Sequence, residues 1–185
     1  DGKLHVNGKE VEIGEAVTQI MLKNRVSIDV DIAYAPEKNP ASFAVHFAEV
    51  RIDKLTGLVK VTKYLAVHDL GQAINRSFVE GQIYGGVQMG IGMALMEDLP
   101  YDKNGRPAVR NFDKYHMINA PDMPEVETLL IEDEEPGGPF GAKSVGEIVT
   151  VPVAAAVVNA VNRGLGTSLT QLPLTPARIV AAAQK

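Results

Sequence analysis

Glu147 is the residue of this sequence whose type and position best suit proton-transfer chemistry. It ends the stretch Gly141-Ala142-Lys143-Ser144-Val145-Gly146-Glu147, a glycine-bounded loop directly ahead of a strongly apolar segment. A carboxylate acts as a general base when it lies within about 2.6 to 3.2 Å of the proton that it removes. A loop that presents the carboxylate beside a helix N-terminus is compatible with that role.

A purely structural role for Glu147 is also compatible with the pattern. Ser144 and Glu147 have the S-x-x-E spacing of a capping box, in which two side chains close the first turn of a helix. Pro152 opposes this role, because in a helix starting at Val145 it would lie two turns inside, without an N–H donor and in steric conflict with the preceding turn. The proline favours a helix that begins near Thr150. The sequence leaves both roles open.

Gln82 lies in a predicted helix that contains an unusual number of glycines. Asn75 can cap this helix, which we expect to run from Arg76 to Glu97. Glycine inside a helix costs about 1 kcal/mol relative to alanine, so its repeated use indicates close approach to another element or to a ligand. Gln82 is then either an exposed polar residue or an amide that faces a polar ligand with both a donor and an acceptor. The interior glycines are Gly81, Gly85, Gly86, Gly90 and Gly92.

Other motifs that could carry chemistry are incomplete. Ala142 stands where a phosphate-binding loop needs glycine directly before its lysine. Leu95 stands where a dinucleotide-binding fingerprint needs glycine or alanine. The acidic run 132–135 is expected to be a solvated strand end. The histidines lack metal-ligand spacing, and we expect each to be a surface or core residue; they are His5, His46, His68 and His116.

The β-rich segments predict a hairpin and one further strand. Residues 42–52 and 58–70 are joined by the sequence DKLTG, in which Gly57 can adopt a left-handed conformation. After an extended, turn-rich segment at 99–125, residues 126–133 read as another strand. These strands must pack with the predicted helices, so the fold class that we expect is α+β.

Three more helices complete the expected architecture. An apolar helix is predicted at 152–163, closed by Gly164, and a short C-terminal helix opens at Pro176. An amphipathic helix is predicted at 13–24, followed by a proline-rich connector at 35–42. We expect residues 1–185 to form a single α+β unit, to which residues 1–40 contribute the N-terminal helix and the connector.

Composition narrows the classes of function. The chain has 185 residues and a net charge of −5, which disfavours nucleic acid as a partner. It contains no cysteine, so an iron–sulfur cluster or a thiol nucleophile would have to lie outside it. No apolar run approaches the roughly 20 residues needed to span a bilayer, and no signal-type segment is visible, so we expect no membrane span and a cytoplasmic location.

Four separated motifs together resemble the molybdenum-cofactor-binding domain of the xanthine dehydrogenase and aldehyde oxidase family. The resemblance covers about residues 40–182 and corresponds to the C-terminal part of the family's catalytic subunit. It is specific because the order and spacing of the motifs agree as well as their residues. The motifs are VHDLGQAIN, VEGQIYGGVQMGIGMALMED, GAKSVGE and LPLTPARI.

The resemblance implies roles for six residues. The glutamate that ends the glycine-containing loop is the catalytic base of the family, and this role falls on Glu147. The glutamine of the E-G-Q motif contacts the pyranopterin, and this role falls on Gln82. The main chain before the glutamate also lies against the cofactor, which implicates Lys143, Ser144, Val145 and Gly146.

The resemblance also implies a reaction and a set of partners. The reaction is hydroxylation of a purine, another N-heterocycle or an aldehyde with oxygen from water. The cofactor is molybdopterin-type, with the cytosine dinucleotide form as one option. The upstream part of the molybdenum subunit would complete the site, and other subunits or domains would carry the iron–sulfur clusters and FAD. A non-catalytic binding or scaffolding module that keeps the fold is the alternative, and Glu147 is the residue that separates the two hypotheses.

Overall fold

The computed structural model describes residues 2–25, 27, 29–33, 35 and 39–184. The chain divides into two compact units, Asp1–Ala35 and Pro36–Lys185. The sequence predicted a single unit with an N-terminal helix and connector; residues 36–38 of the predicted connector lie outside the described residues. Within the described part of the chain, no helix combines the length and apolar character required to cross a bilayer.

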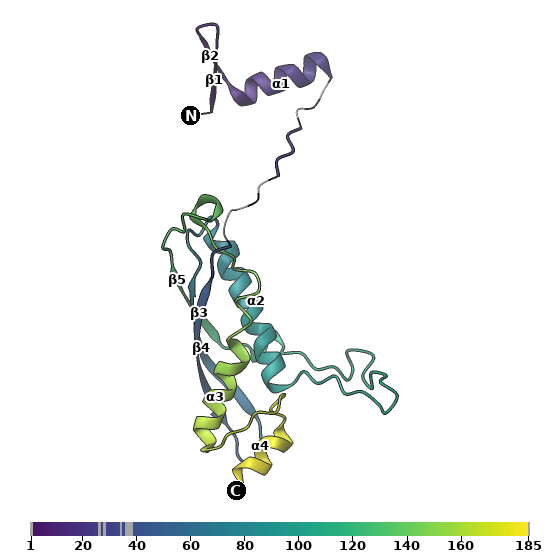
Figure 1. The fold of residues 1–185 in the computed structure, drawn as a ribbon. Coiled ribbons are helices and arrows are strands. Elements are labelled where there is room, and N and C mark those ends of the chain that lie inside the picture. The colour runs from purple at the N-terminus through teal and green to yellow at the C-terminus, as the bar shows by residue number, and fades with distance from the viewer. Residues whose placement is uncertain (1, 26, 28, 34, 36–38, 185) are drawn as a thin grey trace. The chain divides into compact units, whose positions relative to one another are not determined.

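The first unit is a hairpin followed by a helix (Figure 1). Strands β1 (Lys3–Val6) and β2 (Lys9–Glu12) pair antiparallel around Asn7 and Gly8, which both have positive φ. Helix α1 (Ile13–Asn24) confirms the helix predicted at 13–24, and it ends where Arg25 turns left-handed at φ 54°. No strand was predicted ahead of this helix, and the structure shows two short strands on either side of one turn.

The second unit is built on a three-stranded sheet in the order β3-β4-β5. Strands β3 (Phe43–Ile52) and β4 (Val59–Asp69) form the predicted hairpin, with Gly57 in the left-handed conformation at φ 73°. Strand β5 (Glu125–Ile131) confirms the further predicted strand and pairs parallel to β4. Parallel neighbours need a crossover connection, so β5 can pair with β4 only because a helix intervenes.

Helix α2 (Arg76–Leu95) is that crossover, and it lies with α3 (Val153–Leu165) on one side of the sheet (Figure 1). The predicted cap is confirmed, because Asn75 accepts a hydrogen bond of 3.1 Å from the backbone N–H of Phe78. The helix buries Ile83, Val87 and Ile91 completely against the sheet and α3. The hydrophobic core of the unit therefore lies between the two helices and the inner face of the sheet.

The helix that follows the candidate loop corrects one predicted boundary. Gly164 lies inside the last turn of α3, and Gly166, at φ 69°, terminates the helix. A Cβ at Gly164 would come within 2.9 Å of the Ile52 side chain, so this glycine allows close packing on β3. The final helix, α4 (Pro176–Ala183), starts at the predicted proline. The secondary structure agrees with the expected α+β class.

Four of the five glycines of α2 divide into two groups, and the fifth, Gly92, lies against the Glu97 side chain. A Cβ at Gly86 or Gly90 would overlap the side chains of Val149 and Val153, so these glycines allow α2 and the segment entering α3 to pack closely. Gly81 and Gly85 meet nothing within 4 Å and lie on the exposed side of the helix. Close approach to another element therefore explains the first group, and nothing in the described residues explains the second.

This division predicts opposite effects for two neighbouring alanine substitutions. Gly85→Ala should raise the free energy of unfolding by about 1 kcal/mol, because helix propensity improves and the added methyl group meets open space. Gly86→Ala should lower it by about 1 to 3 kcal/mol through overpacking against Val149. Urea denaturation of both purified variants measures the difference. Equal effects would show that the helix contacts do not distinguish the two glycines.

Three polar residues form a hydrogen-bonded cluster inside the core. The Nδ1 atom of His46 lies 2.9 Å from the Tyr64 hydroxyl, and its Nε2 atom lies 2.8 Å from Nε2 of His68. Of the two rings, one donates and the other accepts across the Nε2 pair, since a single proton occupies that bond. Burial lowers the pKa of both histidines, and the neighbouring His68 lowers the pKa of His46 further, to about 4. His46 and His68 are thus core residues, which is one of the two placements, surface or core, that we expected for each histidine.

The cluster predicts a loss of stability in acid. The folded protein keeps His46 neutral down to a pKa of about 4, whereas the unfolded chain binds the proton near pH 6.5. The contribution of neutral His46 to the free energy of unfolding is therefore fully present above about pH 7. It decreases as the pH drops, by about 3 kcal/mol at pH 4. Denaturant unfolding between pH 7 and 4.5 should show a shallower pH slope in His46→Gln than in the exposed control His5→Gln. Identical slopes would contradict the prediction.

Candidate functional site

The loop that carries Glu147 is fixed to the end of β4 by backbone hydrogen bonds. The N–H of Lys143 donates to the carbonyl of Leu70 at 2.7 Å, and the N–H of Gln72 donates to the carbonyl of Gly141 at 2.8 Å. Gly71 pairs with Ala142 between these two bonds and has a φ of 64°. The motifs VHDLGQAIN and GAKSVGE, which lie about 70 residues apart in the chain, are therefore adjacent in the structure.

Side chains tie the same loop down. The Nζ atom of Lys143 lies 2.8 Å from Oδ2 of Asp69, and this ion pair is largely shielded, with side-chain exposures of 10% and 22%. The hydroxyl of Ser42 donates to the carbonyl of Ser144 at 2.7 Å. Gln82 donates through Nε2 to the carbonyl of Gly146 at 3.2 Å. The loop is thus held on three sides, by β4, by the start of β3 and by α2.

The loop leaves a run of backbone donors available. The N–H groups of Ser144, Val145, Gly146 and Glu147 donate to no other residue that the structure describes. Consecutive N–H groups of this kind suit an oxygen-rich or anionic ligand, because several weak dipoles act on the same atoms. The N–H of Lys143 is already used by Leu70, so Lys143 can contribute other atoms to a ligand but not this donor.

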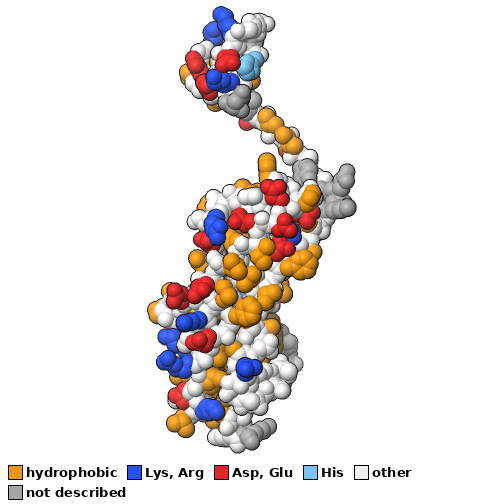
Figure 2. Space-filling model, turned by 90° about the vertical axis from the view of Figure 1, so that its left-hand side faces the viewer, with side chains coloured by type: hydrophobic (Ala, Val, Ile, Leu, Met, Phe, Trp, Pro, Cys, Tyr) orange, Lys and Arg blue, Asp and Glu red, His pale blue; other side chains and the backbone are white. Residues whose placement is uncertain are grey.

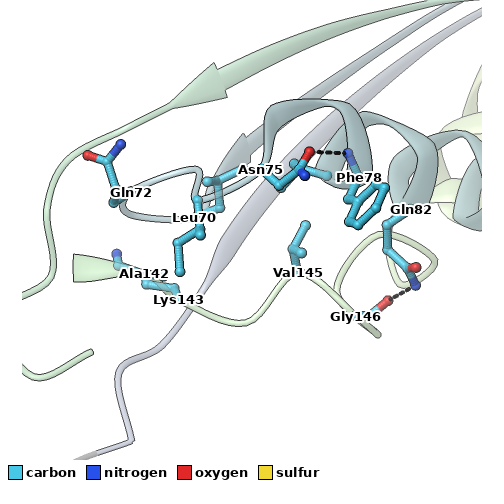
Figure 3. A pocket seen from close by; sticks show the side chains of 11 residues that line it. Leu70, Gln72, Asn75, Phe78, Gln82, Ala142, Lys143, Val145 and Gly146 are labelled. Atoms are coloured by element: carbon cyan, nitrogen blue, oxygen red, sulfur yellow. Dashed lines mark hydrogen bonds between the residues drawn. The ribbon is translucent and has the colours of Figure 1, made fainter. Parts of the chain in front are cut away.

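A cavity of about 380 Å³ lies between this loop and α2 (Figure 3). The lining residues include four of the five expected cofactor contacts: Gln82, Lys143, Val145 and Gly146. Its walls are mainly apolar, from Leu70, Val79 and the exposed ring of Phe78, with amide side chains between them. Such a combination orients a ligand through a few polar groups while the apolar walls exclude water.

Ser144 and Glu147 do not line this cavity. The Glu147 side chain is exposed, and it forms no hydrogen bond or ion pair with another described residue. The capping-box interpretation is wrong, because α3 begins only at Val153, directly after Pro152, and no side chain caps it. Glu147 instead lies in a turn, where its carbonyl accepts from the N–H of Thr150 at 3.0 Å.

Four lining residues from the segment that connects β4 to α2 were not predicted as site residues. They are Leu70, Gln72, Ile74 and Asn75. Their only signal in the sequence was that they belong to the motif VHDLGQAIN. That motif cannot show which of its residues face a cavity, because the facing wall comes from the distant loop. Among the described residues, no group of three or more histidines or carboxylates could hold a metal ion directly.

The fold and the cavity together define an α+β ligand-binding module whose contacts come from a loop and a helix. The molybdopterin cofactor-binding domain family matches residues 1–124, and the chain belongs to this family. The match includes the first 39 residues, which lay outside the resemblance found in the sequence. It also contains Gln82 but ends before the loop 141–147.

Individual relatives agree with this family. The chain is 40% identical over 142 residues to the putative xanthine dehydrogenase molybdenum-binding subunit of Escherichia coli K12, covering 76% of this chain and 19% of that protein. It is 32% identical over 177 residues to the aldehyde oxidoreductase molybdenum-binding subunit of the same strain, covering 95% and 24%. The chain therefore spans about a fifth to a quarter of the length of these relatives.

A solved structure extends the similarity to the whole chain. Quinoline 2-oxidoreductase from Pseudomonas putida 86 superposes with a TM-score of 0.83 at 32% sequence identity, covering 100% of this chain and 25% of that one. The first and second units thus both have counterparts in one larger polypeptide. These relatives agree with the predicted membership of the xanthine dehydrogenase and aldehyde oxidase family.

Proposed function

We propose that this chain supplies the catalytic base and one wall of the cofactor site in a molybdenum hydroxylase. The observation that carries the proposal is the run of unpaired N–H groups at 144–147 beside a cavity that Gln82 closes from the opposite side. A molybdopterin-type cofactor presents polar oxygens to its protein, and backbone donors match such atoms. The residues present therefore fit the group that the family binds.

Each element of the site has a distinct task in this proposal. Gln82 uses one Nε2–H to donate to the carbonyl of Gly146, which leaves the second Nε2–H and the acceptor Oε1 for a ligand in the cavity. Val145 and the N–H groups after it would contact the cofactor, while the ion pair between Lys143 and Asp69 keeps the loop in place. The cofactor, when bound, supplies the redox chemistry of the hydroxylation.

Glu147 is proposed as the group that takes a proton during this reaction. A carboxylate with no partner in its own chain is available to accept a proton from a group that another part of the enzyme places beside it. Its position next to the unpaired N–H groups would bring the base and the cofactor contacts within one short loop. The exposure of Glu147 supports a site whose remaining walls come from polypeptide outside this chain.

The finer assignments follow from the relatives. Their names include a xanthine dehydrogenase, an aldehyde oxidoreductase and a quinoline oxidoreductase, which supports a purine, another N-heterocycle or an aldehyde as substrate. We propose the upstream part of a molybdenum subunit as the immediate partner. Iron–sulfur clusters and FAD would belong to other subunits or domains, and the cytosine dinucleotide form is one option for the cofactor.

Gln82→Ala in the assembled enzyme tests the cofactor site. We expect bound molybdenum to fall several-fold while the melting temperature changes by less than about 2 °C, because Gln82 is exposed and its single internal hydrogen bond contributes little. Elemental analysis beside a melting curve gives both quantities. Gln88→Ala is the matched control, since Gln88 lies on the same helix but bonds to Ile118 and does not line the cavity.

Two outcomes would contradict the cofactor role of Gln82. Full retention of molybdenum in Gln82→Ala would leave it an exposed polar residue. Equal loss in Gln82→Ala and Gln88→Ala would attribute the effect to the helix rather than to the cavity.

A further inference from the structure

The sheet of the second unit has apolar side chains on both of its faces. The inner face packs against α2 and α3, with Tyr64 and Ala66 almost completely buried. On the opposite face, Phe43, Val45 and Phe47 of β3 are 64%, 55% and 57% exposed. Leu129 and Ile131 of β5 are 54% and 47% exposed on that same side. We call these five residues the outer sheet face.

The outer sheet face is continuous across the three strands. Val45 is the register partner of Val67 on β4, and Val67 is the register partner of Leu129 on β5, so one apolar row crosses the sheet. Figure 2 shows hydrophobic side chains gathered over this side of the unit. A sheet with one solvated face alternates apolar and polar residues, whereas strands covered on both faces are apolar at nearly every position. Residues 43–48 of β3, apart from the buried His46, and residues 64–67 of β4 follow the second pattern.

We propose that polypeptide of the same molybdenum-binding subunit, outside these 185 residues, covers the outer sheet face in the assembled enzyme. The proposal rests on the proposed function. The chain matches only 25% of a single chain in quinoline 2-oxidoreductase, so that relative holds three times as much polypeptide again in one covalent molecule. A segment of the same molecule needs no separate association step. Its effective concentration at the face is therefore higher than that of a second copy or another subunit.

The position of the outer sheet face agrees with this occupant. Phe43 is the register partner of Asp69, and the Nζ atom of Lys143 lies 6.0 Å from the centre of the Phe43 ring. The face therefore ends at the loop that bounds the cavity. Ile74 and Phe78, which line the cavity, are 67% and 78% exposed, so the cavity lacks a wall among the described residues. A segment that covers the outer sheet face would end beside Lys143, which lines the cavity.

Photo-crosslinking in the complete, assembled enzyme tests the proposal. p-Benzoylphenylalanine replaces Phe47 in one sample and Leu55, which is 91% exposed in the turn between β3 and β4, in the control. We expect the probe at 47 to react within its own subunit, so that the subunit mass on a denaturing gel stays unchanged and peptide mapping places the cross-link outside residues 1–185. The probe at 55 should give at most a tenth of that yield.

Other products would overturn the proposal. A product of twice the subunit mass would indicate a second copy, and a product that includes another subunit would indicate that subunit. A yield at 47 no higher than at 55 would show a solvated face.

A second variant separates this inference from the proposed function. Val45→Asp should lower the melting temperature of the assembled enzyme by at least about 5 °C, because it would bury an unpaired charge, whereas Leu55→Asp should leave it unchanged. Molybdenum is measured in the crosslinking samples. Full molybdenum content without a cross-link at 47 would contradict only the proposal that the outer sheet face is covered. A cross-link at 47 in an enzyme whose Gln82→Ala variant keeps its molybdenum overturns the cofactor role and leaves the surface assignment standing.

Discussion

Glu147→Gln should reduce turnover of the assembled enzyme by about two to four orders of magnitude, the usual contribution of a general base. The amide has nearly the same shape but cannot accept the proton. Molybdenum content should stay unchanged, because Glu147 does not line the cavity and its side chain forms no hydrogen bond or ion pair with another described residue. The measurement compares kcat on the purine, N-heterocycle or aldehyde that the wild-type enzyme oxidises, with bound molybdenum determined on the same preparations.

Glu125→Gln provides a matched control for that substitution. Glu125 is also an exposed glutamate, but it lies at the start of β5 and outside the candidate loop. Its variant should keep full turnover. If Glu147→Gln keeps full turnover as well, the base is not Glu147, and the alternative of a non-catalytic binding or scaffolding module gains support.

Gly71→Ala should destabilise the protein by about 2 to 4 kcal/mol, because it combines backbone strain with the loss of hydrogen bonds to the candidate loop. Gly71 has a left-handed φ of 64°, and a Cβ there would overlap the carbonyl of Gly141. Moving that carbonyl breaks its bond to Gln72 and disturbs the bond between Lys143 and Leu70. Urea denaturation measures the stability, and bound molybdenum in the assembled enzyme should fall with it.

Gly105→Ala isolates the backbone strain from the loop contacts. Gly105 has a φ of 74°, similar to that of Gly71, but a Cβ there meets nothing within 4 Å. Its substitution should therefore cost only about 1 kcal/mol. Equal losses in the two variants would show that the contact between Gly71 and the loop adds nothing to the stability of the fold.

The sequence alone determined the elements whose signals are local. Asn75 followed by an apolar pattern marked the start of α2, and the β-rich segments on either side of Gly57 marked the hairpin of β3 and β4. Pro152 favoured a helix that begins near Thr150 over one that starts at Val145, and α3 does begin directly after this proline. Capping, β-propensity and proline geometry act over a few residues, so a short stretch of sequence is enough to predict them.

The tertiary structure alone decided the arrangement of the site. Four expected cofactor residues line one cavity because the loop at 141–147 docks on the end of β4, 70 residues away in the chain. The close packing at Gly86, which Gly81 lacks, depends on the path of the chain into α3, and the parallel pairing of β5 depends on the crossover. Distant packing fixes these features, since the contacts that stabilise them join segments whose local patterns carry no information about each other.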